Sequence, residues 1–157
     1  MMPVRLAQAL DAVVARLLDD QQVLARSLAN ASDGATSEES RAENKYDTRA
    51  TEASYLAAGQ SRRAEQLRAT IGRFRQIPRE GGAAVVRGPC LVTLAGSAGE
   101  SHYLLGPGAG GLAVEVDGVT VRVLTAESPL GRTLVGACEG DEVASPGGQA
   151  LTVVRVD

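Results

Sequence analysis

The chain has 157 residues, 44% of them hydrophobic, which is enough apolar material for the core of one domain or of two small ones. Aromatic residues make up only 3%, with one phenylalanine and no tryptophan, which argues against an aromatic-lined small-molecule site. The net charge is −3, no stretch approaches the roughly 20 apolar residues that span a bilayer, and no signal-peptide pattern opens the sequence, so a cytoplasmic protein without a membrane segment is expected.

The first predicted element is a long helix that begins near Leu6. Its apolar residues recur at steps of three and four, which is a coiled-coil seam with a stutter around Leu17. The seam consists of Leu6, Leu10, Val13, Leu17, Gln21, Leu24, Leu28 and Ala31. Residues 32–35, with the sequence Ser-Asp-Gly-Ala, are expected to join this helix to the next one.

The second predicted helix continues the same spacing without a break. Its seam consists of Tyr46, Ala50, Ala53, Ala57, Gln60, Ala64, Leu67, Ile71 and Phe74. Because the two helices are adjacent in the chain, an antiparallel coiled-coil hairpin is expected over residues 1–79, with Leu28 and Ala31 beside Tyr46 and Ala50. A helix of about 29 residues is on the order of 40 Å long, so the hairpin is expected to form a projecting finger. A seam completed within one chain favours a monomer, although an exchanged dimer is also open.

Charged residues are segregated along this hairpin. The expected tip, residues 33–47, is acidic and contains Asp33, Glu38, Glu39, Glu43 and Asp47. The segment that follows is basic and contains Arg62, Arg63, Arg68, Arg73, Arg75 and Arg79. Clustered arginines, above all Arg62, Arg63 and Arg68, favour nucleic acid or an acidic protein surface as a partner, although a solvated helix face also explains them.

Three of the tip carboxylates recur every four residues. A helix that begins near Thr36 would place Glu39, Glu43 and Asp47 on one face. The alternative is structural, because Ser40 and Glu43 fit the capping box, in which each side chain bonds to the backbone N–H group of the other residue. Both interpretations stay open.

Residues 80–157 are rich in glycine, valine and turn pairs and predict a small β-rich domain. The expected hairpins pair 89–96 with 101–106, 112–116 with 119–125, and 141–145 with 150–156. An antiparallel sheet of five or six strands with one short helix follows, so the fold class is α+β. Cys90 and Cys138 lack CxxC spacing and are expected to be reduced thiols, and the single histidine, His102, argues against a histidine metal site or a catalytic triad.

The segment of residues 127–148 is the most informative part of this domain. Ser128 can accept from the first free N–H groups of a helix, and Pro129 suits the first helical position. The apolar face of this helix is expected to consist of Leu130, Leu134 and Val135. Gly136 ends the helix, and residues 146–148, Pro-Gly-Gly, supply a tight connection between two strands.

With its Ser-Pro helix start, its Gly-Asp-x-Val strand and its Pro-Gly-Gly turn, this segment resembles the C-terminal end of the bacterial transcript-cleavage factors GreA and GreB. The predicted order, a coiled-coil hairpin with an acidic tip followed by a small β domain, is similar to that family over nearly the whole length. Residues 43–67 are also similar in character to the start of the family's second helix. The resemblance implies an FKBP-like fold for residues 80–157.

In that family, the β domain docks at the secondary channel of RNA polymerase, and two tip carboxylates help to hold a second Mg²⁺ for cleavage of a backtracked transcript. The resemblance implies that Glu43, together with Glu39 or Asp47, supplies these carboxylates, and that Glu43 and Asp47 hold Mg²⁺ only with the polymerase. The implied contacts to core polymerase are Ser128, Pro129 and Leu130. The tip would lie near nascent RNA, and the chain would be an accessory factor, not an enzyme by itself.

The first tip acid of the family falls on Ser40 in this chain. The alternative function is therefore a non-cleaving regulator or inhibitor at the secondary channel, like the Rnk-type proteins. Prolyl isomerase activity is disfavoured, because the β domain offers only Tyr103 where such a pocket needs several aromatic side chains. A purely structural coiled-coil module is the remaining class.

Overall fold

The structure, a computed structural model, describes residues 3–41 and 47–157, with side chains described outside 31–55 and 57. It forms two units. The helical unit comprises Leu17–Ile71, and the β unit combines Met1–Arg16 with Gly72–Asp157. The sequence placed the division between residues 79 and 80, whereas the tertiary contacts assign the first sixteen residues to the β unit.

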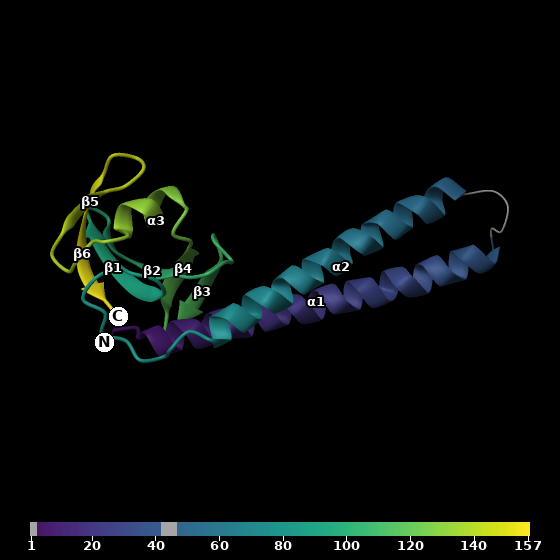
Figure 1. The fold of residues 1–157 in the computed structure, drawn as a ribbon, viewed down its shortest axis with the longest axis horizontal. Helices are drawn as coiled ribbons and strands as arrows, with labels where there is room; N and C mark the ends of the chain where they lie inside the picture. Colours follow the sequence, from purple (N-terminus) through teal and green to yellow (C-terminus); the bar gives the residue numbers. More distant parts are fainter. Residues whose placement is uncertain (1–2, 42–46) are drawn as a thin grey trace. The chain divides into compact units, whose positions relative to one another are not determined.

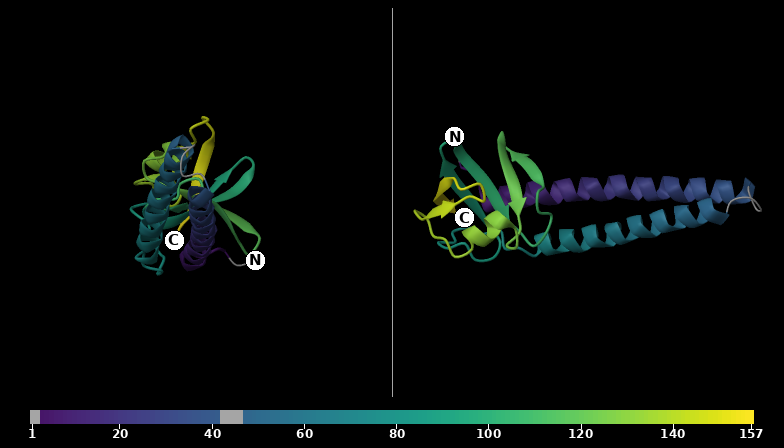
Figure 2. Two further views of the ribbon diagram at one scale, coloured as in Figure 1. Left: turned by 90° about the vertical axis from the view of Figure 1, so that its right-hand side faces the viewer. Right: turned by 90° about the horizontal axis from the view of Figure 1, so that it is seen from above.

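The helical unit is an antiparallel hairpin of two long helices, α1 (Leu6–Arg41) and α2 (Asp47–Arg75). The two helices lie side by side in all three views (Figures 1 and 2). The expected seam is confirmed where side chains are described. Within Leu17–Ile71, the two end residues of the seam are buried, and the seam residues between them whose side chains are described are half-buried, namely Gln21, Leu24, Leu28, Gln60, Ala64 and Leu67.

The expected turn at residues 32–35 is wrong, because α1 continues through this segment to Arg41. A single glycine inside a helix costs only about 1 kcal/mol relative to alanine, and the segment contains no proline to break the hydrogen-bonded ladder. The connection therefore falls between Arg41 and Asp47. The expected pairing of Leu28 and Ala31 with Tyr46 and Ala50 involves side chains outside the described ones.

The β unit contains one six-stranded sheet and one short helix. The elements are β1 (Cys90–Gly96), β2 (Gly99–Leu105), β3 (Ala113–Val116), β4 (Val119–Leu124), α3 (Pro129–Leu134), β5 (Glu142–Ala144) and β6 (Ala150–Val156). The three expected hairpins are confirmed, since β1 pairs with β2, β3 with β4, and β5 with β6, each antiparallel. Asp117 and Gly118 both have positive φ in the two-residue β3–β4 turn, as a type I′ turn requires.

The sheet is mixed, so the expectation of a fully antiparallel sheet is wrong in one pair. The strand order is β3-β4-β2-β1-β6-β5, and β2 pairs with β4 in parallel. Both strands alternate, since Val114 and Val116 of β3 and Val121 and Val123 of β4 are buried while the residues between them are exposed. The shorter β3 takes the edge of the sheet.

Each face of the sheet has its own apolar cover. On one face, α3 packs through Leu134 onto a cluster that also contains Val86, Cys90, Val92, Leu94, Leu105, Ala137, Val153 and Val156. Phe74 of the last α2 turn is buried against Gly106, where an added Cβ would come within 2.8 Å of the ring. The start of α1 belongs to the same unit and is bound to it by two polar contacts. The Leu6 N–H group donates a hydrogen bond to the Asp157 carboxylate at 2.8 Å, and Asp11 forms a salt bridge with Arg79.

Candidate functional site

The predicted tip carboxylates lie at the connection between the two long helices. Glu39 falls in the last turn of α1, and Asp47 is the first residue of α2. Glu43 lies outside the described residues, as do the side chains of the other two. The expectation that one helix carries all three carboxylates on one face is wrong, because they are divided between α1, the connection and α2.

The capping-box interpretation of this segment is also wrong. Ser40 lies inside α1, one residue before its end, whereas a helix-capping serine precedes the helix that it caps. Glu43 is therefore not needed as the capping partner of Ser40. Among the described residues, no group of three or more His, Cys, Asp or Glu side chains is placed to hold a metal ion.

The Ser-Pro segment forms the expected helix start. The Ser128 side chain accepts from the Gly131 N–H group at 3.1 Å, and its hydroxyl donates to the Thr125 carbonyl at 2.7 Å. Pro129 occupies the first turn of α3, where its missing N–H group leaves no donor unpaired. The structural role that the sequence assigned to Ser128 and Pro129 is thus confirmed.

The helix α3 buries fewer apolar residues than expected. Leu134 is buried and Leu130 is half-buried against the core cluster, but Val135 is 47% exposed, so its expected place on the apolar face is wrong. Gly131 is buried, and an added Cβ there would clash with the Thr125 carbonyl oxygen. Pro129 at the start of α3 and Val135 at its C-cap are exposed apolar residues.

Two carboxylates that no sequence motif singled out hold the connections next to α3. Asp141 accepts from the Cys138 N–H group at 2.8 Å, and Glu139 accepts from the Val156 N–H group at 2.9 Å. Asp141 follows its donor by three residues, the spacing at which the acid of a capping box reaches back to a backbone N–H group, and this spacing was the available signal. Both acids serve the fold of the β unit.

The arginines of α2 do not form one stripe. Arg62, Arg63 and Arg68 are all exposed. At about 100° per residue, their positions are separated by roughly 100° to 140° around the helix, so no flat partner contacts all three. The solvated-face interpretation suits Arg62 and Arg68, while Arg63 lines a groove.

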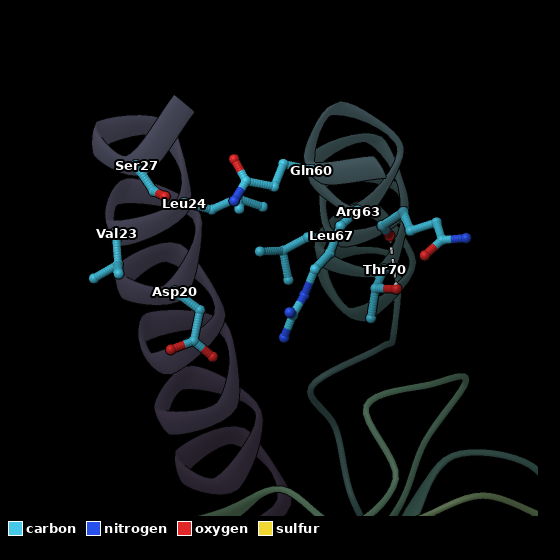
Figure 3. Close-up of a pocket in the computed structure, with 9 residues that line it drawn as sticks. Asp20, Val23, Leu24, Ser27, Gln60, Arg63, Leu67 and Thr70 are labelled. Carbon is cyan, nitrogen blue, oxygen red and sulfur yellow. Dashed lines mark hydrogen bonds between the residues drawn. The ribbon is translucent and has the colours of Figure 1, made fainter. Parts of the chain in front are cut away.

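This groove lies between the two helices of the hairpin and has a volume of about 560 Å³. We call it the inter-helix groove; its lining residues are Asp20, Val23, Leu24 and Ser27 of α1 and Gln60, Arg63, Gln66, Leu67 and Thr70 of α2. Figure 3 shows Leu24 and Leu67 pointing toward each other across it, with Arg63 on the α2 side and Asp20 on the α1 side. The Gln60 Oε1 atom is buried and has no hydrogen-bond partner among the described residues.

A second hollow, of about 460 Å³, lies at the ends of β2 and β4. Its lining includes Glu100, His102, Tyr103 and Arg122. His102 Nδ1 lies 3.0 Å from the buried Thr93 hydroxyl, which places the single histidine in a sheet contact, as expected for a strand position.

The two cysteines are free. Cys90 is buried at the start of β1, and Cys138 is half-buried.

Across the described residues, none of the helices combines the length and the apolar composition that crossing a bilayer requires.

No protein-family model and no curated protein matches this chain. Among solved structures, it is similar to the transcription factor Gfh1, with 19% identity over 92% of this chain and 93% of that chain and a TM-score of 0.40. It is similar to GreA factor homolog 1 (Gfh1) of Thermus thermophilus at 18% identity, over 92% and 94% of the two chains, with a TM-score of 0.38. It is similar to Thermus aquaticus Gfh1 at 19% identity, over 93% of this chain and 94% of that chain, with a TM-score of 0.37.

Proposed function

We propose that this chain is an accessory transcription factor that binds RNA polymerase at the secondary channel and acts on paused or backtracked complexes. One observation carries the proposal: a long antiparallel hairpin and the segment of residues 127–148, folded as a Ser-capped helix, a strand and a tight turn, occur in one chain. This is the combination that the resemblance to GreA and GreB implies.

The proposed polymerase contact is the surface around α3. Ser128 fixes the start of this helix by two hydrogen bonds, and Leu130 anchors it to the core cluster. The exposed Pro129 and Val135 are therefore held in place before binding, and a partner meets them without the entropy loss of ordering a loop.

The proposed cleavage residues are Glu39, Glu43 and Asp47 at the connection of the hairpin. Carboxylate oxygens are the hard ligands that Mg²⁺ prefers, and Mg²⁺ is commonly held by one or two of them beside other groups. Glu43 and Asp47, four residues apart, would hold the ion jointly with the polymerase. When bound, such an ion can activate a water molecule for cleavage of the transcript.

Transcript cleavage in a backtracked elongation complex tests the proposal. The variants Glu39→Ala, Glu43→Ala and Asp47→Ala are compared with Glu65→Ala, which removes an exposed acid from α2 away from the connection. We expect at least about a tenfold loss of cleavage in one or more tip variants, with unchanged binding to the polymerase and an unchanged rate for the control. Absence of stoichiometric binding to core polymerase would reject the proposal.

A non-cleaving regulator is the second candidate, and the observation that favours it is Ser40 at the place of the family's first tip acid. This candidate predicts binding to core polymerase without release of short 3′ RNA fragments. Release of such fragments by the purified protein and polymerase would exclude it.

A further inference from the structure

We propose that the hollow at the ends of β2 and β4 binds the phosphate group of a small organic molecule. The inference does not depend on the proposed function. It rests on backbone groups that the sheet directs into the hollow, on an arginine beside them and on three hydroxyl groups of the same sheet face.

The hollow exists because β2 and β4 separate before their hydrogen-bonded ladder begins. The first paired residues of the two strands are His102 and Val121. Residues 100–101 of β2 and 119–120 of β4 precede this pair and line the hollow. Here each strand is held only by its own hairpin, β2 by β1 and β4 by β3. The facing edges of the two strands therefore border an open space of about 460 Å³.

The register of the sheet shows which groups of β2 face this space. Leu91 of β1 exchanges both backbone hydrogen bonds with Asp157, so the residue opposite it on β2, Leu104, directs its own groups toward β4. The direction alternates along a strand, and the N–H and C=O groups of Glu100 therefore also point toward β4. They reach the hollow, because β4 is not paired with β2 at this level.

The same alternation gives β4 a second donor. Val123 bonds toward the β3 side through both its N–H and C=O groups, so Thr120, three residues earlier, directs its groups toward β2. The ladder with β2 starts only at Val121, which leaves the Thr120 N–H group without a backbone partner among the described residues. One residue of β2 with both groups open is too little to pair with an added strand, so a compact ligand fits this site better than an extended peptide.

Polar side chains on the α3 face of the sheet add to these donors. Tyr103 packs against the core cluster that α3 covers, and Arg122 is its register partner on β4. Ser101 and Thr120 share this face, because side chains alternate along each strand. Arg122 is exposed and forms no ion pair within the part of the chain that the structure describes. This face of the hollow thus offers one guanidinium and three hydroxyl groups.

This set of groups selects a phosphate as the ligand. A guanidinium matches phosphate oxygens with two parallel N–H groups, and backbone N–H groups bind the same oxygens. The Glu100 carbonyl needs a donor, and a protonated phosphate carries an O–H group beside its acceptor oxygens, whereas an ionised carboxylate has acceptors alone. The volume of the hollow exceeds that of a phosphate and leaves room for a small organic group.

One acid at the edge of the site opposes a phosphate. The Thr120 hydroxyl donates to the Glu115 carboxylate at 3.4 Å, so a negative charge lies beside the hollow. The Glu100 side chain alternates to the other face of the sheet. An anionic ligand is repelled by Glu115 and attracted by Arg122, whereas a cationic ligand responds in the opposite sense. Variants at these two positions therefore report the sign of the ligand's charge.

Amide nuclear magnetic resonance of the full chain tests the proposal, with inorganic phosphate as the probe at constant ionic strength. We expect saturable shifts of the Glu100 and Thr120 amide signals with a dissociation constant of about 1 mM. Arg122→Gln should raise this constant at least about tenfold, and Glu115→Gln should lower it about threefold. Arg87→Gln is the matched control, because Arg87 is exposed and lies outside the hollow.

The spectra of the variants also show whether each keeps its fold. Glycerol phosphate should shift the same two amides and further signals of the hollow, where its organic part lies. The proposal is overturned by the absence of saturable shifts up to about 20 mM phosphate. Equal weakening in Arg87→Gln and Arg122→Gln overturns it as well, and so do shifts that only a single-stranded oligonucleotide produces. Binding to core polymerase, measured separately, decides the proposed function independently of this result.

Discussion

Ser128 shows how one side chain can fix a surface. Its hydroxyl both donates to the Thr125 carbonyl and accepts from the Gly131 N–H group, so it joins the preceding loop to the first turn of α3. We expect Ser128→Ala to lower the free energy of unfolding by about 1 kcal/mol, the usual loss for a helix cap. Urea denaturation checks this value, with Ser97→Ala in the exposed β1–β2 turn as the control that should change little.

Cys90 is a residue whose environment makes stability depend on pH. Burial raises the pKa of its thiol from 9.0 to about 11. The native state therefore keeps this proton to higher pH than the unfolded chain does. The thiol contributes stability below pH 9 that is lost as the pH rises toward 11, by up to about 1.4 kcal/mol per pH unit.

The measurement is a comparison of wild type and Cys90→Ala by urea denaturation across this pH range. The stability of the wild type relative to the variant should decrease as the pH rises, because only the wild type titrates at this position. A constant difference would contradict the burial effect. In the native protein, a thiol reagent should modify the half-buried Cys138 before Cys90.

At the scale of elements, glycine has opposite roles in α2 and α3. Gly59 and Gly72 of α2 have no atom within 4 Å of an added Cβ, so an alanine there only reduces backbone freedom. We expect Gly59→Ala and Gly72→Ala each to raise stability by about 0.5–1 kcal/mol. Thermal unfolding followed by the circular dichroism signal of the helices checks that each variant is more stable than the wild type.

Gly131→Ala is the opposite case, although it too is a helical position. The added Cβ would meet the Thr125 carbonyl oxygen, a backbone atom that cannot move aside as a flexible side chain can. We expect a loss of about 1–3 kcal/mol through overpacking. Gly147→Ala is the control, because the nearest atom to an added Cβ there, Ser145 Oγ, lies 3.8 Å away. Equal stability of the two variants would refute the close approach of Gly131 to the Thr125 carbonyl oxygen.

Elements whose structure depends on residues close together in the sequence could be predicted from the sequence. The seams of α1 and α2, the Asp117–Gly118 turn and the Ser128 cap each rest on residues within a few positions of one another, where local rules apply. The place of the helix–helix connection could not be predicted, because Gly34 suggests a turn but tolerates a helix.

The remaining errors arose from contacts distant in the chain. Whether β3 or β4 pairs with β2 depends on contacts across the sheet, and Val135 is exposed at the C-cap of α3, where the chain leaves the helix. The alternation of apolar residues is the same for either strand order. For the candidate site, the helix start at Ser128 was predictable, while the inter-helix groove depends on two helices that meet side by side.

At the scale of the whole molecule, the β unit is formed by two separate parts of the chain. Leu6, Leu10 and Val13 of the first part are buried, and the Leu6 N–H group is held by Asp157. We expect residues 80–157 alone to lack a stable fold, because they leave out these residues and Phe74. A chain that joins residues 3–16 to 72–157 by a flexible linker should fold cooperatively.

Near-ultraviolet circular dichroism and urea denaturation distinguish the two truncated chains. If residues 80–157 alone unfold with the same cooperativity as the linked chain, the packing of α1 and Phe74 onto the sheet contributes little, and the boundary at residue 80 would be the correct one.

The continuous helical repeat of the hairpin makes its length adjustable. Residues 17–71 interrupt the β unit once, and beyond the stutter at Leu17 the sequence of the seam repeats in groups of seven. Removal of seven residues from each helix shortens the hairpin by about 10 Å while every remaining seam residue keeps its face. Insertions and deletions of this size leave the sheet and its core unchanged. The helical unit can thus act as a spacer of graded length, which sequence change can alter in equal steps without redesign of the rest of the protein.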